Sequence, residues 1–464
     1  LLSNFKIKIG TNFTYQHNDK IISEYEVLII FFNHLYNLLY KSFPDTQFNV
    51  VLTVPSNFND TQRTILMDVA KKVGFNILRI INEPTAAAFA YGIDNNVEDE
   101  KILVFDLGGG TMDLSILEID DNFFETIDSV GVNDLGGNNF TDVIYEDAIR
   151  QFKQQFKIEE VLISKNKLIQ LWYKCNKAKE KLSWVDSCQI QVKDFLKKNN
   201  QNYDLIYNLD ISKFKNLAIP LIDRIRRKID LLKDKHSITK IILVGGSSKL
   251  DLVKQQIKEQ FKIEPMVHTQ LQHVVSLGAT YYGALIQKEL ADNEIILVDN
   301  LPLSLGIETA EGSFSPIISK NTPLPATRSK KYTIDTPGEK SVLVKVYQGE
   351  RSIASKNFLI GEFEFDKISK INQPVINITF KVDINGLINV TIEDKHSGSN
   401  KDILIKNSID IKQDVSDIIK ISSQLEEEDN NELIKNQLYY KLEIRIEQIL
   451  NNITNNNLIK VNNK

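Results

Sequence analysis

Residues 102–113 read ILVFDLGGGTMD, and this stretch indicates the fold of the first half of the chain. The apolar residues 102–105 form a short strand. Three glycines follow it closely, and they let the backbone turn tightly and bring N–H groups close to phosphate oxygens. Thr111 adds a hydroxyl donor, and Asp106 and Asp113 place a carboxylate at each end of the turn. A bound phosphate would be repelled by these two carboxylates unless a hard cation such as Mg²⁺ lay between them. The stretch therefore predicts a site for a nucleotide together with its cation. The alternative is a plain hairpin with a flexible tip.

A second strand that runs into glycines occurs at residues 241–248, which read IILVGGSS. We expect a helix to begin at about Leu250. This turn lacks carboxylates, so a sugar or a base could pack against its bare backbone. Taken alone, it could equally be an ordinary strand–helix junction. The pair of turns indicates two similar lobes that face one ligand.

The region around these turns alternates short β-branched runs with helical runs from residue 50 to residue 290, which is typical of an α/β domain. Residues 50–54 and 78–81 are expected strands with a helix between them. Glu83 lies just past the second strand, where α/β proteins usually collect their functional side chains.

The composition becomes β-rich beyond a short apolar strip at residues 294–299. Asn385-Gly386 is a hairpin signal, and with the strands beside it this predicts an antiparallel sandwich that ends near Asn407. A charged helical tail is expected from about residue 410. The expected strands of the sandwich are residues 341–347, 375–380 and 387–392.

The overall composition excludes several classes of protein. The chain has 464 residues, with 42% hydrophobic and 25% charged residues, which fits two or three soluble domains. A net charge of -5 argues against a nucleic-acid partner. The longest apolar stretch, residues 27–40, is too short to span a bilayer, so no membrane partner is expected. Cys175 and Cys188 are too few for a disulfide framework.

Longer motifs connect these features. They are VLTVP at 51–55 with FND at 58–60, IINEPTAAA at 80–88, the turn at 104–117, LVGGSS at 243–248, PLSLGIET at 302–309 and YQGER at 347–351. Together they resemble the seventy-kilodalton heat-shock chaperones, the heat shock protein 70 family. The resemblance extends over most of the chain, to about residue 446, and several of its motifs are long and ordered.

The resemblance implies a fold of the α/β plus all-β class. An actin-like (ribonuclease H-like) two-lobed ATPase domain would cover residues 1–292, and an interdomain linker residues 293–300. A β-sandwich peptide-binding domain would follow over residues 301–407. Residues 408–464 would form a partial helical lid and a disordered tail.

The resemblance also implies catalytic roles in a site for ATP or ADP with Mg²⁺. Asp106 would hold the metal through water, and Glu83 would support the metal's water shell. Thr111 would touch the γ-phosphate, and Asp113 would help to place the attacking water.

The same resemblance assigns residues to the nucleotide itself. Gly245, Gly246 and Ser247 would hold the nucleoside, and Lys249 stands where the family often has an arginine over the adenine. Lys179 and Ser183 would complete the adenosine pocket. The glycines expected around the nucleotide are Gly108, Gly109, Gly110, Gly136 and Gly137.

Outside the nucleotide site, Val342 and Val344 are candidate walls of an apolar peptide pocket, with Ile307 nearby. For Val342, an ordinary place in the sandwich core is an equally good interpretation. Pro55 and Arg63 match the family's relay between domains. Leu297 and Asp299 belong to a strip, residues 295–299, that matches its docking linker. The alternative for this strip is an edge strand of the sandwich.

The sequence also departs from the family pattern. The family's first phosphate loop and its lysine near the γ-phosphate do not occur, because residues 1–49 resemble the family's segment immediately after those two elements. We therefore expect a divergent, N-terminally incomplete copy whose ATP hydrolysis is impaired, since phosphoryl transfer depends on positioning and charge. Asn176 and Glu180 stand where the family usually has an acid and an arginine, and Asn138 and Asn139 replace carboxylates.

These motifs favour an ATP-dependent chaperone that binds extended apolar segments of unfolded proteins. By resemblance, its partners would be unfolded client polypeptides, J-domain co-chaperones and nucleotide-exchange factors, and it would be a cytoplasmic monomer. The first alternative is a degenerate, non-catalytic peptide-holding or regulatory paralogue, or a pseudogene product. The second is another actin-like phosphotransferase such as a sugar kinase, against which the sandwich argues.

Overall fold

We describe a computed structural model of the chain, which divides into two compact units. One comprises residues 1–58 and 65–300, and the other residues 59–64 and 301–464. The structure describes residues 5–11, 13–17, 20–56, 58–95, 99–120, 123–157, 163–198, 201–267, 273–289, 295–309, 311–334, 341–371, 373–405, 425–439 and 442.

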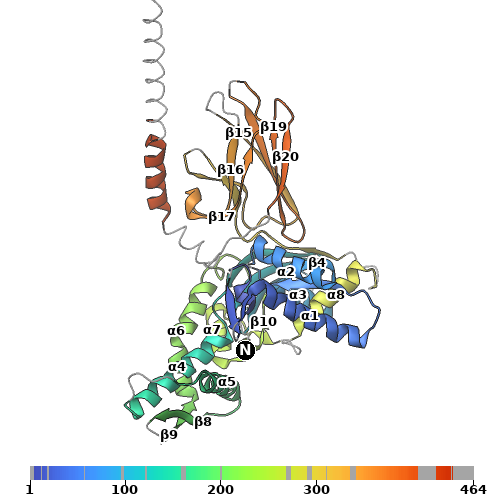
Figure 1. Ribbon diagram of the computed structural model, residues 1–464. Coiled ribbons are helices and arrows are strands. Elements are labelled where there is room, and N and C mark those ends of the chain that lie inside the picture. The colour runs from blue at the N-terminus through green and yellow to red at the C-terminus, as the bar shows by residue number, and fades with distance from the viewer. Residues whose placement is uncertain are drawn as a thin grey trace, which may run out of the picture. The chain divides into compact units, whose positions relative to one another are not determined.

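A six-stranded sheet is the centre of the first unit (Figure 1). Its strand order is β11-β10-β5-β6-β7-β12. β5, β6 and β7 form an antiparallel meander, whereas β10 lies parallel to β5 and to β11. The strands are β5 (Glu100–Leu107), β6 (Met112–Asp120), β7 (Phe123–Val132), β10 (Lys240–Val244), β11 (Met266–Val267) and β12 (Ile296–Val298).

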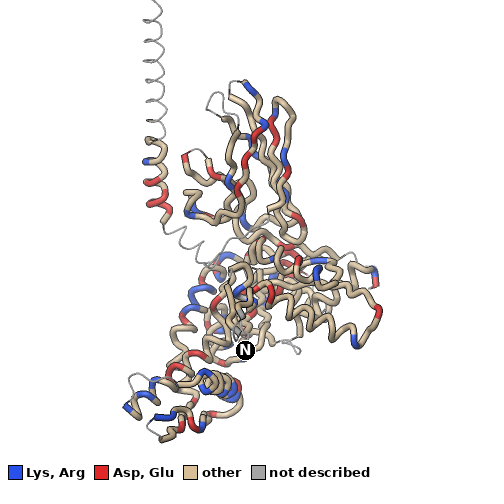
Figure 2. Tube along the Cα trace, viewed as in Figure 1, with Lys and Arg blue, Asp and Glu red and all other residues tan. Residues whose placement is uncertain are grey.

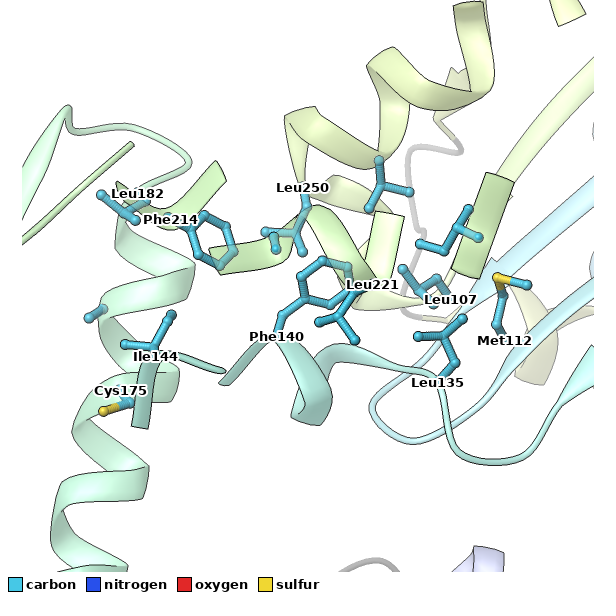
Figure 3. Close-up of a cluster of buried hydrophobic side chains, with 14 of the residues drawn as sticks. Leu107, Met112, Leu135, Phe140, Ile144, Cys175, Leu182, Phe214, Leu221 and Leu250 are labelled. Carbon is cyan, nitrogen blue, oxygen red and sulfur yellow. The ribbon is translucent and has the colours of Figure 1, made fainter. Parts of the chain in front are cut away.

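Both faces of this sheet are buried, which explains the continuous apolar run in β5. Successive side chains of a strand point to opposite faces. Leu103 and Phe105 accordingly pack into one core with α4 (Gly137–Gln155), α5 (Lys165–Lys181), α6 (Ile211–Ile229) and α7 (Asp251–Phe261), part of which Figure 3 shows. Ile102 and Val104 pack into the other, with α3 (Glu83–Asn95) and α8 (Val274–Ile286).

A third core lies under the parallel pair β3 (Asn49–Val54) and β4 (Asn76–Asn82). Apolar residues of α1 (Glu24–Ser42) and α2 (Asp60–Val73) fill it. The short 3-10 helix η1 (Phe5–Lys8) leads into this core through Ile9, which is 2% exposed. Two hairpins complete the unit: β1 (Thr14–His17) with β2 (Lys20–Ser23), and β8 (Ser187–Lys198) with β9 (Gln201–Asp210).

The second unit holds two four-stranded antiparallel sheets whose inner side chains share one core, so the predicted sandwich is confirmed. The expected strands and the hairpin at Asn385-Gly386 are present, and Gly386 has φ 81°, the left-handed conformation that this turn needs. One sheet has the order β14-β13-β16-β17 and the other β15-β18-β19-β20. The strands are β13 (Leu305–Glu308), β14 (Phe314–Ile318), β15 (Ala326–Thr333), β16 (Val342–Gln348), β17 (Phe358–Phe365), β18 (Val375–Val382), β19 (Ile388–Asp394) and β20 (Asn400–Leu404).

Residues 426–439 are helical, and within the second unit a bidentate ion pair joins this helix to the sandwich. Arg351 Nε and Nη2 each donate to the Asp429 carboxylate, at 2.6 Å. The remainder of the predicted lid and tail, apart from residues 425 and 442, lies outside the described residues.

The apolar strip at residues 295–299 differs from one expectation. Its strand, β12, pairs in parallel with β7, as an edge strand of the six-stranded sheet. The alternative, an edge strand of the sandwich, is therefore wrong. The strip pairs there because Leu297 enters the core that α3 and α8 cover, where it is 4% exposed.

Two further findings concern the cysteines and the hydropathy of the helices. Cys175 and Cys188 are free thiols. None of the helices in the described ranges is both long and apolar enough to cross a membrane.

Candidate nucleotide-binding site

Three glycine-containing turns meet beyond the carboxyl ends of strands β5, β7 and β10 of the six-stranded sheet. They are the β5–β6 turn (108–111), the turn that starts α4 (136–137) and the turn after β10 (245–248). Gly108 O accepts the Gly137 N–H at 2.9 Å and the Ser247 hydroxyl at 2.8 Å. The Asn138 N–H donates to Gly109 O at 2.8 Å. The structure thus brings together the two turns that the sequence singled out, with a third between them.

The closeness of these turns requires glycine. A Cβ atom on Gly136 would lie 2.6 Å from the backbone of Gly109 and Gly110, inside any van der Waals contact. Gly245 has φ 79°, and a Cβ atom there would collide with the Leu107 carbonyl and the Asp106 carboxylate. Backbone therefore lies directly on backbone at these two positions.

The turns are held in place by the core beneath them (Figure 3). Leu107 and Met112 flank the first turn, Leu135 precedes the second and Leu250 follows the third. All four side chains belong to one buried cluster. The positions of the turns therefore depend on the packing of this core.

The predicted catalytic carboxylates gather beside the first turn. Asp106 and Asp113 are paired across β5 and β6, and both are buried. Glu83 is the first residue of α3. Burial, and then the negative charges of Glu83 and Asp113, raise the pKa of Asp106 to about 8, while Lys6 lowers it. The three acids are thus close enough to influence one another.

Two residues at this cluster were not predicted from the sequence. The buried Ser56 hydroxyl donates to Asp113 Oδ1 at 2.7 Å. The Lys6 ammonium contacts Glu83 Oε1. Ser56 lies just beyond β3 as Glu83 lies just beyond β4, so its place after a parallel strand was a usable signal. For Lys6 we find no comparable signal.

The donors at the cluster fit a hard divalent cation. Carboxylate oxygens and a threonine hydroxyl are the ligand types that Mg²⁺ prefers, directly or through water. Within the described part of the chain, no three His, Cys, Asp or Glu side chains are close enough to ligate one ion together. The binding of Mg²⁺ by Asp106 through water stays a prediction.

Lys179 is the buried lysine of α5, a helix along which Figure 2 shows many basic residues. Its ammonium donates to Gly137 O at 2.6 Å and to Thr141 Oγ1 at 3.0 Å. Burial lowers the pKa of Lys179 to about 8, although Glu180 and Asp142 act in the opposite direction. Lys179 thus supports the second glycine turn.

Other predicted nucleoside residues are more exposed. Ser183 lies in the exposed turn after α5, and Lys249 is exposed at the end of the 3-10 helix η2 (Gly246–Lys249). The Asn176 amide donates to Glu180 Oε1 at 2.9 Å, so these two departures from the family pattern bind each other. The roles of these residues stay predictions.

The predicted linker residues are well fixed within the first unit. Leu297 O accepts a hydrogen bond from Arg79 Nη2 at 3.1 Å. Asp299 accepts from the Thr85 hydroxyl at 2.6 Å and from the Asn82 N–H at 3.2 Å.

The remaining predicted residues have simple environments. Pro55 and Arg63 are both buried, and their relay role stays a prediction. Ile307 and Val344 lie in the sandwich core, and Val342 packs at its edge. Their role in peptide binding also stays a prediction.

Comparison with known protein families identifies the family of this chain. The family model described as Hsp70 protein matches residues 6–463. The chain belongs to the Hsp70 family. Hsp70 membership implies an actin-like ATPase joined to a β-sandwich, a chaperone function in protein folding, and nucleotide binding with Mg²⁺. The roles of the glycine turns and carboxylates of this Hsp70 chain in nucleotide binding stay predictions.

The contact between turns generates a stability prediction. We expect Gly136→Ala to lower the free energy of unfolding by about 1–3 kcal/mol, since its Cβ would force two backbones apart. Urea unfolding measures this change. Gly108→Ala is the matched control, because the nearest atom to its Cβ, Thr111 O, is 3.7 Å away. Equal effects of the two substitutions would show that the close approach is unimportant.

The burial of Lys179 generates a pH prediction. Its pKa is about 8 in the folded state and near its ordinary 10.5 when unfolded, so between these values the unfolded chain binds more protons. Stability from this group therefore rises as the pH increases from 8 to 10.5. Relative to Lys179→Met, the wild type should gain roughly 2–3 kcal/mol between pH 7 and pH 10.

Urea titrations at the two pH values test this. The control is Lys181→Met, which removes an exposed lysine of the same helix and should keep the wild-type pH dependence. A Lys179→Met variant whose stability difference from the wild type is independent of pH would contradict the prediction.

Proposed function

We propose that this protein is a nucleotide-regulated chaperone that binds extended apolar segments of unfolded proteins, with ATP binding and slow hydrolysis controlling their release. The observation that carries the proposal is the convergence of three glycine turns beside Asp106, Asp113 and Thr111. Glycine turns and hydroxyls are suited to phosphates, and carboxylates to the cation that accompanies them.

The residues of the site would have different roles in ATP hydrolysis. Glycine turns place the nucleotide, since phosphoryl transfer depends mainly on positioning and charge stabilisation. Ser56 orients the Asp113 carboxylate, which would accept a hydrogen bond from the attacking water. Bound Mg²⁺ would neutralise phosphate charge, with Asp106 and Glu83 as its partners through water.

The linker strip supplies a route from nucleotide to peptide. Thr85, which donates to Asp299, lies on the same helix as Glu83, so one element contacts both the linker and the carboxylate cluster. A small displacement of α3 would therefore reach the strip that precedes the sandwich. We propose that this coupling involves Pro55 and Arg63 as well.

The sandwich is the proposed peptide-binding unit. Extended peptides bind such sheets through strand-like hydrogen bonds and pockets for apolar side chains. We propose Ile307, Val342 and Val344 as the pocket residues, and unfolded clients, J-domain co-chaperones and nucleotide-exchange factors as partners. A cytoplasmic location is part of the same proposal.

A second candidate function is a non-catalytic peptide holder or regulator. The observation that favours it is the pairing of Asn176 with Glu180 beside the predicted adenosine pocket, where the family usually has an acid and an arginine. Such a protein would bind peptide with little response to nucleotide.

Nucleotide binding separates the two functions. We expect the wild type to bind a fluorescent ADP analogue in Mg²⁺, and Asp106→Asn to weaken this binding about tenfold, because the cation loses a carboxylate partner. Without Mg²⁺ the difference should shrink. Asp251→Asn, which alters a carboxylate 68% exposed on α7, is the control. Absence of binding by the wild type would favour the non-catalytic function.

Peptide binding tests the pocket. We expect Val342→Phe to weaken the binding of a labelled apolar peptide about tenfold by filling the pocket. The control is Leu343→Phe, on the next residue of the same strand, whose side chain is 55% exposed. Thermal unfolding checks that both variants are folded, and an unchanged affinity for Val342→Phe would remove the pocket assignment.

A further inference from the structure

Lys6 is a basic residue at the acidic centre of the candidate site. Its ammonium contacts Glu83 Oε1, and its charge acts on Asp106. The Glu83 side chain is 14% exposed, whereas that of Lys6 is 40% exposed, so the lysine reaches the cluster from its solvent side. Three neighbouring carboxylates repel one another, and a positive charge beside them offsets part of that repulsion.

Lys6 is held there by packing on both sides of it in the sequence. The Phe5 ring lies 5.1 Å from the Phe31 ring of α1. Ile9 is inserted in the core with Leu28, and its N–H donates to Lys6 O at 3.4 Å. The backbone of Lys6 is therefore anchored to α1, and its long side chain extends from a fixed point.

Glu83 is also stabilised by its position in the first turn of α3, because the N-terminal end of a helix favours a negative charge. A divalent cation brought in by a nucleotide would be held through water by two of the same carboxylates, Asp106 and Glu83. It would also repel a nearby ammonium, and this repulsion is strong where water is partly excluded. The lysine and the cation therefore cannot both be close to Glu83 at little cost.

We propose that Lys6 is the resident counter-ion of the carboxylate cluster of Glu83, Asp106 and Asp113, and that a divalent cation entering with nucleotide displaces its ammonium from Glu83. Lys6 is then a positioning residue that sets the affinity for the cation. The displacement rests on the proposed nucleotide function, whereas the ion pair itself does not.

Mn²⁺, whose free form is measured by electron paramagnetic resonance, is the probe for the cation. In the presence of ADP, Lys6→Met should bind Mn²⁺ about fivefold more tightly than the wild type, since no ammonium has to be displaced. Lys6→Arg keeps the charge and should match the wild type. Lys8→Met should also match it, because Lys8 lies over the Phe13 ring.

Equal or weaker Mn²⁺ binding by Lys6→Met would overturn the displacement. Binding by no variant would overturn the proposed nucleotide function and the displacement together. A double-mutant cycle of Lys6→Met and Glu83→Gln in thermal unfolding, without ligand, tests the counter-ion role separately. Additive effects of the two substitutions would overturn that role, and a non-zero coupling would support it.

Discussion

The first unit depends on the direct contact of backbone with backbone where its three glycine turns meet. No side chain fits between Gly136 and the Gly109–Gly110 peptide, so the first two turns hold one another by hydrogen bonds between main-chain atoms, and the Ser247 hydroxyl joins the third turn to the first. Main-chain contacts of this kind are short and have little freedom. They transfer the rigidity of the core beneath, through Leu107, Leu135 and Leu250, to the atoms that would surround a phosphate.

The second constraint is electrical. The burial of Asp106 and Asp113 lowers the stability of the chain. Burial disfavours the charged form of a carboxylate, and neighbouring acids disfavour it further, as they do at Asp106. The structure limits this disadvantage with the hydroxyl of Ser56 and the ammonium of Lys6. Buried acids with a raised pKa, such as Asp106, are typical of functional sites, where a ligand completes the charge balance.

Much of this arrangement could be predicted from the sequence, because its signals are local. The strand at 102–105, the turn after it and the Asn385-Gly386 hairpin each follow from a few adjacent residues. The partner of the strip at 295–299 could not be predicted, since a three-residue strand shows no preference for one sheet over another. Lys6 was not found because its partner, Glu83, is distant in the sequence and the two come together through the packing of Phe5 and Ile9.

The same strip has a consequence for how linker docking proceeds. Leu297 is buried between Ile296, which is 52% exposed, and Val298, and Asp299 is fixed by Thr85. Sliding β12 by a single residue along β7 would turn Leu297 to solvent and separate Asp299 from its donors. No intermediate register keeps half of these contacts. The strip should therefore bind to β7 as a whole or dissociate from it as a whole, so that its docking is all-or-none.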